Sequence, residues 1–133
     1  MKIAAQMYSV HDTAAKGYAD ALKQVAKMGF QAVELAAGCG YAEFDGKPVD
    51  LKKCLDDLGI TAIGAHVSTE SVIDPEERKK MIEFYSILNA RFMICPYDGR
   101  FMDPAANAKF ADDFNQAAEE LKKAGMYCGY HNH

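Results

Sequence analysis

The stretch Thr61-Ala62-Ile63-Gly64-Ala65-His66-Val67 is a short, mainly apolar run that has the character of a buried strand. Similar runs start near Lys2, Ala32, Arg91 and Met126, so successive starts, counting Thr61, lie 30, 29, 30 and 35 residues apart. A period of about 30 residues is the size of one strand–helix unit of a parallel sheet. The runs do not alternate cleanly between apolar and polar residues, which is typical of strands covered on both faces. The pattern predicts an α/β fold of parallel (β/α) units.

The segments between these runs have helical spacing. Tyr18, Leu22, Val25 and Ala26 fall on one face of a helix, and the segment Asp74-Pro75-Glu76-Glu77 is a strong helix start. We predict that the first strand runs over residues 3–10 and ends in a turn at residues 11–13. Linkers and low-complexity segments are lacking, which predicts a single domain over residues 1–133.

The length is the second clue to the architecture. A closed (β/α)8 barrel has about 250 residues, whereas this chain has 133. We therefore expect the first four to five strands of a TIM barrel, a half-barrel truncated after its fifth strand.

Composition excludes several classes of protein. The net charge is −4 and the pI about 5.5, so a basic surface for nucleic acid is not expected. Apolar runs fall short of the roughly 18 residues of a membrane span, and a signal peptide is not apparent after Met1. The four cysteines lack C-x-x-C spacing and are typical of reduced thiols in a cytoplasmic protein; they are Cys39, Cys54, Cys95 and Cys128.

Polar side chains follow the predicted strands where each strand ends. All parallel strands of a barrel end at the same face, so side chains far apart in the sequence should line one pocket there. The residues at these ends are Gln6, Tyr8, Glu34, His66, Tyr97, Asp98, His131 and His133.

Each of these candidates also has a structural interpretation. Glu34 lies between two apolar residues, where a carboxylate needs a partner, and that partner could be a lysine in a structural ion pair. His66 could be a hydrogen-bonded core histidine. His131 and His133 would face the same side of a strand, which suits a divalent metal or proton transfer, although a frayed terminus would leave both in water. His11 is expected to be solvated.

Four motifs occur in order along the chain: residues 6–12, Gln-Met-Tyr-Ser-Val-His-Asp; residues 29–34, Gly-Phe-Gln-Ala-Val-Glu; residues 64–67, Gly-Ala-His-Val; and residues 129–133, Gly-Tyr-His-Asn-His. Together they resemble the sugar phosphate isomerase/epimerase family, the xylose-isomerase-like TIM barrels, over the whole chain. One departure is His11, where the family more often has arginine.

The resemblance implies proton transfer next to a sugar carbonyl, with a divalent metal (Mn, Zn, Mg or Co) stabilising the enediolate. It implies Glu34 and His131 as catalytic groups, Gln6, Tyr8 and His66 as substrate-binding groups, and His133 as a metal ligand. It also implies further metal ligands on three later strands, an acidic residue, a histidine and a glutamate, which this chain does not contain. The chain alone is therefore expected to hold an incomplete active site.

Three interpretations remain open at this point. The chain could be the N-terminal part of a sugar isomerase or epimerase, a self-associating half-barrel that serves as a structural or binding module, or a sugar lyase or hydratase on the same scaffold. The expected ligand is a sugar or sugar phosphate. Because a half-barrel has two open sheet edges and an uncovered inner face, we also expect a homodimer.

Overall fold

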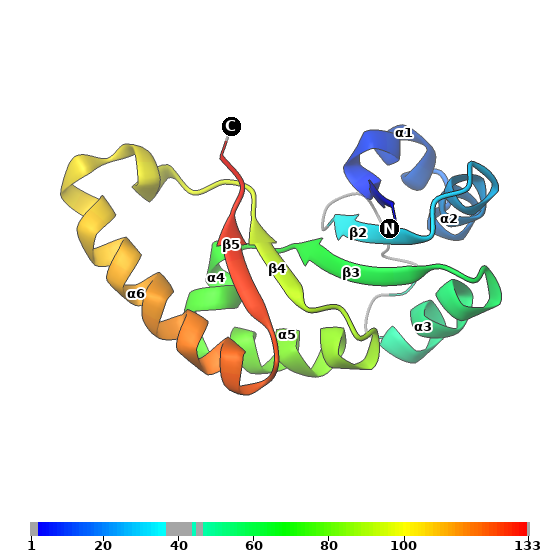
Figure 1. Cartoon of the computed structure of the whole chain (residues 1–133). Coiled ribbons are helices and arrows are strands. Elements are labelled where there is room, and N and C mark those ends of the chain that lie inside the picture. Colours follow the sequence, from blue (N-terminus) through cyan, green and yellow to red (C-terminus); the bar gives the residue numbers. More distant parts are fainter. Residues whose placement is uncertain (1–2, 37–43, 45–46, 133) are drawn as a thin grey trace.

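A computed structural model of the protein describes residues 3–36, 44 and 47–132. Its centre is one five-stranded parallel sheet with the sequential order β1-β2-β3-β4-β5. The strands are β1 (Ala4–Gln6), β2 (Ala32–Ala36), β3 (Thr61–His66), β4 (Phe92–Cys95) and β5 (Tyr127–Tyr130). Their C-terminal ends converge on one region, which is also where the chain terminus lies (Figure 1). The fold is the first half of a TIM barrel, as the sequence predicts.

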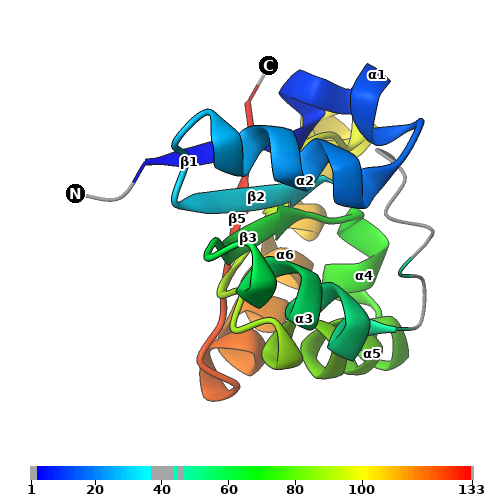
Figure 2. The same ribbon diagram turned by 90° about the vertical axis from the view of Figure 1, so that its right-hand side faces the viewer.

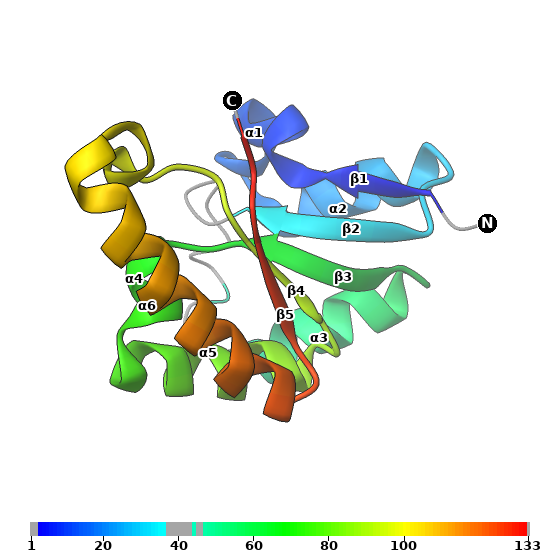
Figure 3. The ribbon, with the colours of Figure 1, turned by 60° about the vertical axis from the view of Figure 1, so that its left-hand side comes forward.

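The helices that connect the strands lie along the outer side of the sheet (Figures 2 and 3). The helical elements are η1 (Met7–Val10), α1 (His11–Ala14), α2 (Tyr18–Lys27), α3 (Pro48–Asp57), α4 (Thr69–Ile73), α5 (Pro75–Ile87), η3 (Gly99–Met102) and α6 (Pro104–Lys123). None of the helices in the described residues is both long enough and apolar enough to cross a membrane.

The residues that the sequence marks as helix starts and stops lie at the ends of helices in the structure. Asp74 caps α5 by accepting hydrogen bonds from the backbone N–H groups of Glu76 and Glu77 at 3.0 and 2.9 Å. Gly29 follows α2 with a φ of 91°, and Asn89 occupies the equivalent left-handed position after α5 with a φ of 56°. These stops turn the chain back toward the sheet at each repeat.

The prediction of one strand over residues 3–10 was wrong. The strand β1 ends at Gln6, and the chain continues into η1 and α1, so residues 11–13 form a helix rather than a turn. The physical reason is local, since the Gln6 side-chain oxygen accepts a hydrogen bond from the Tyr8 N–H and bends the backbone directly after the strand. Met7 is then fully buried in the core, although it lies outside any strand.

The hydrophobic core lies between the outer face of the sheet and the helices. Alternate strand residues such as Val33, Leu35, Ala65, Met93 and Cys95 are completely buried there. Helices α2, α3 and α6 supply the matching faces, which include Tyr18, Leu22, Val25, Leu51, Leu55, Phe110 and Leu121. Helix α4 was not anticipated from the sequence; Ser68 caps it by accepting a hydrogen bond from the Ser71 N–H at 3.1 Å.

Candidate active site

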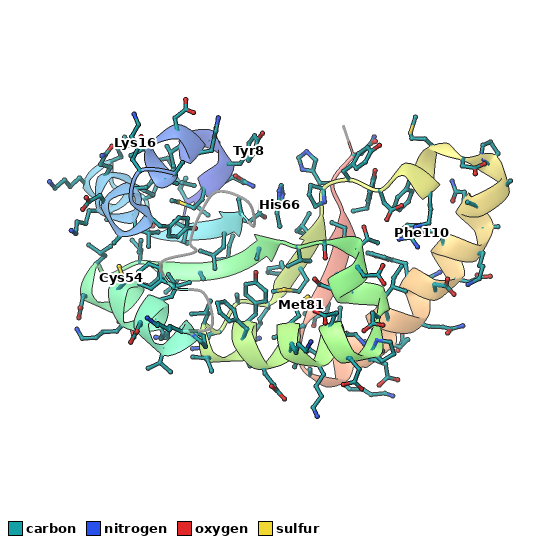
Figure 4. The ribbon with its side chains drawn as sticks, turned by 180° about the vertical axis from the view of Figure 1, so that it is seen from behind. Tyr8, Lys16, Cys54, His66, Met81 and Phe110 are labelled. Carbon is teal, nitrogen blue, oxygen red and sulfur yellow. The ribbon has the colours of Figure 1, made fainter. Side chains whose placement is uncertain are left out.

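A hollow of about 520 Å³ opens at the C-terminal end of the sheet. Its lining comes from the ends of all five strands and from the segments that follow them: Gln6, Tyr8, Ser9, Ala36, His66, Pro96, Tyr97 and His131. Figure 4 shows Tyr8 and His66 at this end of the molecule, whereas Met81 lies between the sheet and α5. Of the polar residues expected at the strand ends, five line the hollow, namely Gln6, Tyr8, His66, Tyr97 and His131, whereas Glu34 and Asp98 are not among its lining residues.

Glu34 and His66 form the centre of the site. They lie on neighbouring strands, and His66 Nε2 is 3.2 Å from Glu34 Oε1. A shift in the register between Val33 and Glu34 pairs Glu34 with Gly64 and Ala36 with His66. The side chains are 23% and 14% exposed, respectively. Glu34 is therefore partnered by a histidine rather than by a lysine, and its carboxylate stays open to the inner side of the sheet.

Gln6 fixes the orientation of His66. The Gln6 amide nitrogen lies 3.2 Å from His66 Nδ1 and 3.4 Å from His66 Nε2. Because the Gln6 oxygen already accepts the Tyr8 N–H, the amide group turns its N–H donors toward the imidazole. His66 Nε2 faces a carboxylate, which only accepts, so we assign the imidazole proton to Nε2 and the accepting lone pair to Nδ1. A directed chain of hydrogen bonds thus runs from Tyr8 N–H through Gln6 and His66 to Glu34.

His131 stands on the other side of His66. Its ring packs edge-on against His66, with the ring centroids 5.3 Å apart. The His131 N–H donates to the Cys95 carbonyl at 2.9 Å, which continues the sheet pairing one residue beyond β5 and anchors the backbone. The structure therefore brings together three of the predicted groups, Glu34, His66 and His131.

Tyr8 lines the hollow next to β1, and His11 packs against Tyr8. Their rings stack at 4.9 Å, and the Tyr8 side chain is 61% exposed. His11 Nδ1 lies 2.8 Å from the Tyr8 carbonyl, and Nε2 lies 3.2 Å from the Asp12 carboxylate. The His11 side chain is half exposed, as the sequence suggested, but its two nitrogens have partners within its own turn.

Asp98 has a structural role. Its carboxylate accepts two hydrogen bonds from the Arg100 guanidinium, at 2.9 and 2.7 Å, and one from the Arg100 N–H at 2.9 Å. The hydrogen bonds from Arg100 lower the pKa of Asp98 to about 2. A carboxylate held so firmly in its ionised form is a poor general base at neutral pH. Tyr97, the neighbour of Asp98, lines the hollow. Its carbonyl accepts a hydrogen bond from the Thr69 hydroxyl at 3.4 Å.

The described residues do not fit a divalent metal. Within residues 3–36, 44 and 47–132, groups of three or more histidine, cysteine, aspartate or glutamate side chains able to hold an ion are absent. Glu34, His66 and His131 converge without forming such a group. The expected ligand His133 lies outside the described residues.

Three lining residues were missed in the sequence. Ser9, Ala36 and Pro96 carry no ionisable group, so a search for chemistry did not find them. The available signal was position, because Ala36 ends β2 and Pro96 directly follows β4. Small or rigid residues at such ends leave room for a ligand.

Protein-family models and functionally curated proteins give no match. Two solved sugar phosphate isomerase/epimerases from Parabacteroides distasonis are similar in both structure and sequence. One has 29% identity and a TM-score of 0.77, over 99% of this chain and 51% of that chain. The other has 31% identity and a TM-score of 0.76, over 99% of this chain and 55% of that chain.

A xylose isomerase domain protein from Alicyclobacillus acidocaldarius shares the fold, with 16% identity and a TM-score of 0.69 over 98% of this chain and 49% of that chain. The chain therefore spans about half the length of the solved structures that it matches. Over its full length it resembles the N-terminal half of the sugar phosphate isomerase/epimerase and xylose-isomerase-like barrels.

Proposed function

We propose that this half-barrel carries the first half of a sugar phosphate isomerase or epimerase active site and binds a sugar or sugar phosphate in the hollow at the strand ends. The observation that carries the proposal is the oriented chain Gln6–His66–Glu34 at the C-terminal face of the sheet. It holds a carboxylate beside a hollow large enough for a small polyhydroxylated molecule. The two Parabacteroides distasonis structures support this reaction class at 29% and 31% identity.

The proposed reaction begins with proton removal next to the sugar carbonyl. A Glu34 carboxylate oxygen takes the proton, the C–H bond breaks, and its electron pair forms the double bond of an enediolate. Return of that proton from Glu34 to the former carbonyl carbon, with a proton shifted between the two oxygens, gives the isomer. The epimer needs a proton delivered to the opposite face of the original carbon by a second group, after which Glu34 gives up its own proton to solvent. The hydrogen bond from His66 keeps Glu34 in place while it changes charge.

The remaining site residues have supporting roles in this proposal. His131 lies across His66 from Glu34 and is the second acid–base group, which passes a proton to or from the substrate oxygens. Gln6 and Tyr8 position the sugar, since both line the hollow and Gln6 also sets the His66 tautomer.

We assign no step to a metal, because the described residues hold too few ligands in one place. A divalent ion such as Mn²⁺, the cofactor that the family resemblance implies, would need ligands in addition to Glu34, His66 and His131. We therefore propose that the isolated chain binds such an ion weakly and turns over sugars slowly or not at all.

Binding and proton exchange test the proposal more sensitively than turnover. Fructose 6-phosphate and fructose are titrated into the ¹⁵N-labelled protein, and the loss of their exchangeable C–H signals in D₂O is followed over days. We expect amide shifts at Gln6, Ala36 and His66, weak binding with Kd on the order of millimolar, and slow exchange. Glu34→Gln should abolish exchange but keep binding, whereas the exposed Glu83→Gln in α5 should change neither.

The two probes separate the ligand classes. Tighter binding of fructose 6-phosphate favours a phosphorylated substrate, and equal binding favours the sugar portion alone. Amide shifts confined to the helices, or exchange that is equally fast in Glu34→Gln, would refute the assignment of the site.

The state of the cysteine thiols is relevant to the redox state of the compartment in which the protein is found. Among the described residues, Cys95 and Cys128 are free thiols, and burial raises the pKa of the Cys95 thiol to about 12, so that it stays protonated. We propose a reducing, cytoplasmic environment on this basis. Protein recovered without reductant should retain these thiols as titratable groups after unfolding.

A further inference from the structure

Thr69 is a buried polar residue that has no role in the proposed mechanism. Tyrosine and cysteine apart, it is the only buried polar or charged side chain within residues 3–36, 44 and 47–132, with 5% exposed. It is the first residue of α4 and follows His66 by three positions. A buried hydroxyl needs a hydrogen-bond partner, so the contacts of Thr69 indicate what it holds in place.

The partners of the Thr69 hydroxyl lie in the segment that follows β4. The hydroxyl donates a hydrogen bond to the Tyr97 carbonyl at 3.4 Å. It also acts on the next residue, because the pKa of Asp98 is lowered chiefly by the hydrogen bonds from Arg100 and to a smaller extent by one from Thr69. One hydroxyl from the turn after β3 thus reaches two adjacent residues of the segment after β4.

The end of the backbone pairing between β3 and β4 explains why a side chain is needed here. The Val67 N–H donates to the Ile94 carbonyl at 2.9 Å, which continues the pairing one residue beyond β3. The next backbone donor on the β4 side would be residue 96, and Pro96 has no N–H. The hydroxyl of Thr69 supplies a link between the two segments at the point where the backbone cannot.

The segment held by Thr69 forms one wall of the hollow. It leads from the C-terminal end of β4 toward the start of α6 (Figure 1). Pro96 and Tyr97 line the hollow, and the Tyr97 side chain is 70% exposed. In the described part of the chain, the Thr69 hydroxyl makes the only hydrogen bond to Tyr97. Asp98 is held from the other direction by the Arg100 guanidinium, which lies over the ring of a phenylalanine in α6.

We propose that Thr69 is a positioning residue, whose hydroxyl holds residues 96–98 in place as a wall of the sugar site. The function of the wall rests on the proposed function, whereas the contact that holds it does not. Without the hydroxyl the Tyr97 carbonyl loses its partner, and the segment becomes freer to move. A sugar must then order the wall when it binds, and this cost lowers the affinity. Proton removal by Glu34 from a sugar that is already bound should keep its rate.

Two substitutions separate the hydroxyl from the shape of the side chain. Thr69→Val keeps the size and branching but removes the hydroxyl, whereas Thr69→Ser keeps the hydroxyl. The matched control is Thr61→Val, an exposed position at the opposite end of the strand that precedes α4.

The first readout is the segment itself, without sugar. The Arg100 and Phe101 amides donate to the Asp98 side chain and carbonyl at 2.9 and 3.1 Å. In Thr69→Val we expect faster hydrogen exchange at both amides and a higher pKa of the Asp98 carboxyl in a ¹³C NMR titration. Both readouts should stay at their wild-type values in Thr69→Ser and in Thr61→Val.

The second readout is sugar binding. Thr69→Val should raise the Kd for fructose 6-phosphate by about fivefold, the usual net effect of one neutral hydrogen bond. The rate of C–H exchange at saturating sugar should not change, and Thr69→Ser should bind as the wild type does. If the wild type binds no sugar, the proposed function fails, and the amide exchange and the Asp98 titration still decide whether Thr69 holds the segment.

A further measurement needs no variant. The hydroxyl proton of wild-type Thr69 should exchange with water slowly enough to be observed by NMR, because it is buried and hydrogen-bonded, and it should lie close to the Asp98 amide proton. A hydroxyl proton that exchanges freely overturns the proposal. So does a Thr69→Val protein with unchanged amide exchange, or with an unchanged Kd for a sugar that the wild type binds. Equal losses in Thr69→Ser would also overturn it, because the hydroxyl would then not be their cause.

Discussion

Replacing Asp98 with asparagine should destabilise the loop that follows β4 and forms one wall of the candidate site. Asparagine keeps the size of the side chain and can still cap η3, but it removes the charge opposite Arg100. The pKa of Asp98 falls from an ordinary 3.8 to about 2, chiefly through the Arg100 hydrogen bonds. A lowering of this size corresponds to about 2 kcal/mol. Because the Arg100 side chain is 41% exposed, solvent screening reduces our expectation to about 1 kcal/mol at neutral pH.

The Asp98–Arg100 pair also predicts how its contribution to the free energy of unfolding depends on pH. The folded-state pKa lies below the unfolded value, so the unfolded chain takes up the proton first as the pH falls. The stabilisation is complete above the unfolded pKa and is lost as the pH drops from about 4 to about 2. The stability difference between wild type and Asp98→Asn should therefore be constant from neutral pH down to about pH 5 and then shrink.

Urea unfolding followed by far-UV circular dichroism at several pH values measures this difference. The matched control is Asp57→Asn on α3, whose partner Lys53 lies 2.5 Å away in an ion pair with side chains 63% and 73% exposed. That change should cost much less than Asp98→Asn, because solvent screens an exposed ion pair. Equal losses for Asp98→Asn and Asp57→Asn, or a wild-type-to-Asp98→Asn difference that persists at pH 2, would show that the Arg100 contact does not stabilise the fold.

Three further predictions concern the sheet and the site. Gly64→Ala should cost about 3 kcal/mol in thermal unfolding, because its Cβ would lie 2.3 Å from the Phe92 carbonyl oxygen, and an unchanged midpoint would contradict that packing. Gln6→Leu removes the hydrogen bond to the His66 ring, so both neutral tautomers of His66 should be populated. The ¹⁵N shifts of the imidazole report the tautomers, and a proton that stays on Nε2 would mean that Glu34 alone sets the tautomer. Mn²⁺ should bind to the wild type with a Kd on the order of millimolar, and more weakly after His131→Ala. Calorimetry that shows tight stoichiometric binding, unchanged by His131→Ala, would disprove the proposal that the metal site is incomplete.

The candidate site was partly predictable, because position along a repeat is visible in the sequence. His66 ends β3 and His131 directly follows β5, whereas Glu34 lies in the middle of β2; parallel topology sends the strand ends to one face. The partner of Glu34 could not be predicted, since it depends on the register shift after Val33. The role of Asp98 was also hidden, because the same strand-end position suits a catalytic group and a capping carboxylate equally well.

By itself, the sequence determined the type and order of the repeated units. A buried strand followed by an amphipathic helix that ends at glycine or asparagine is encoded within about 30 residues, and short-range sterics and burial dictate each unit. Only the tertiary structure decided where β1 ends, because the Gln6 side-chain oxygen accepts a hydrogen bond from the Tyr8 N–H while its amide nitrogen reaches past β2 to His66 on β3. It likewise decided that the Phe92 and Tyr127 rings stack on adjacent strands. Such contacts join residues 35 to 60 positions apart, and pairing across the sheet, rather than local propensity, sets their distances.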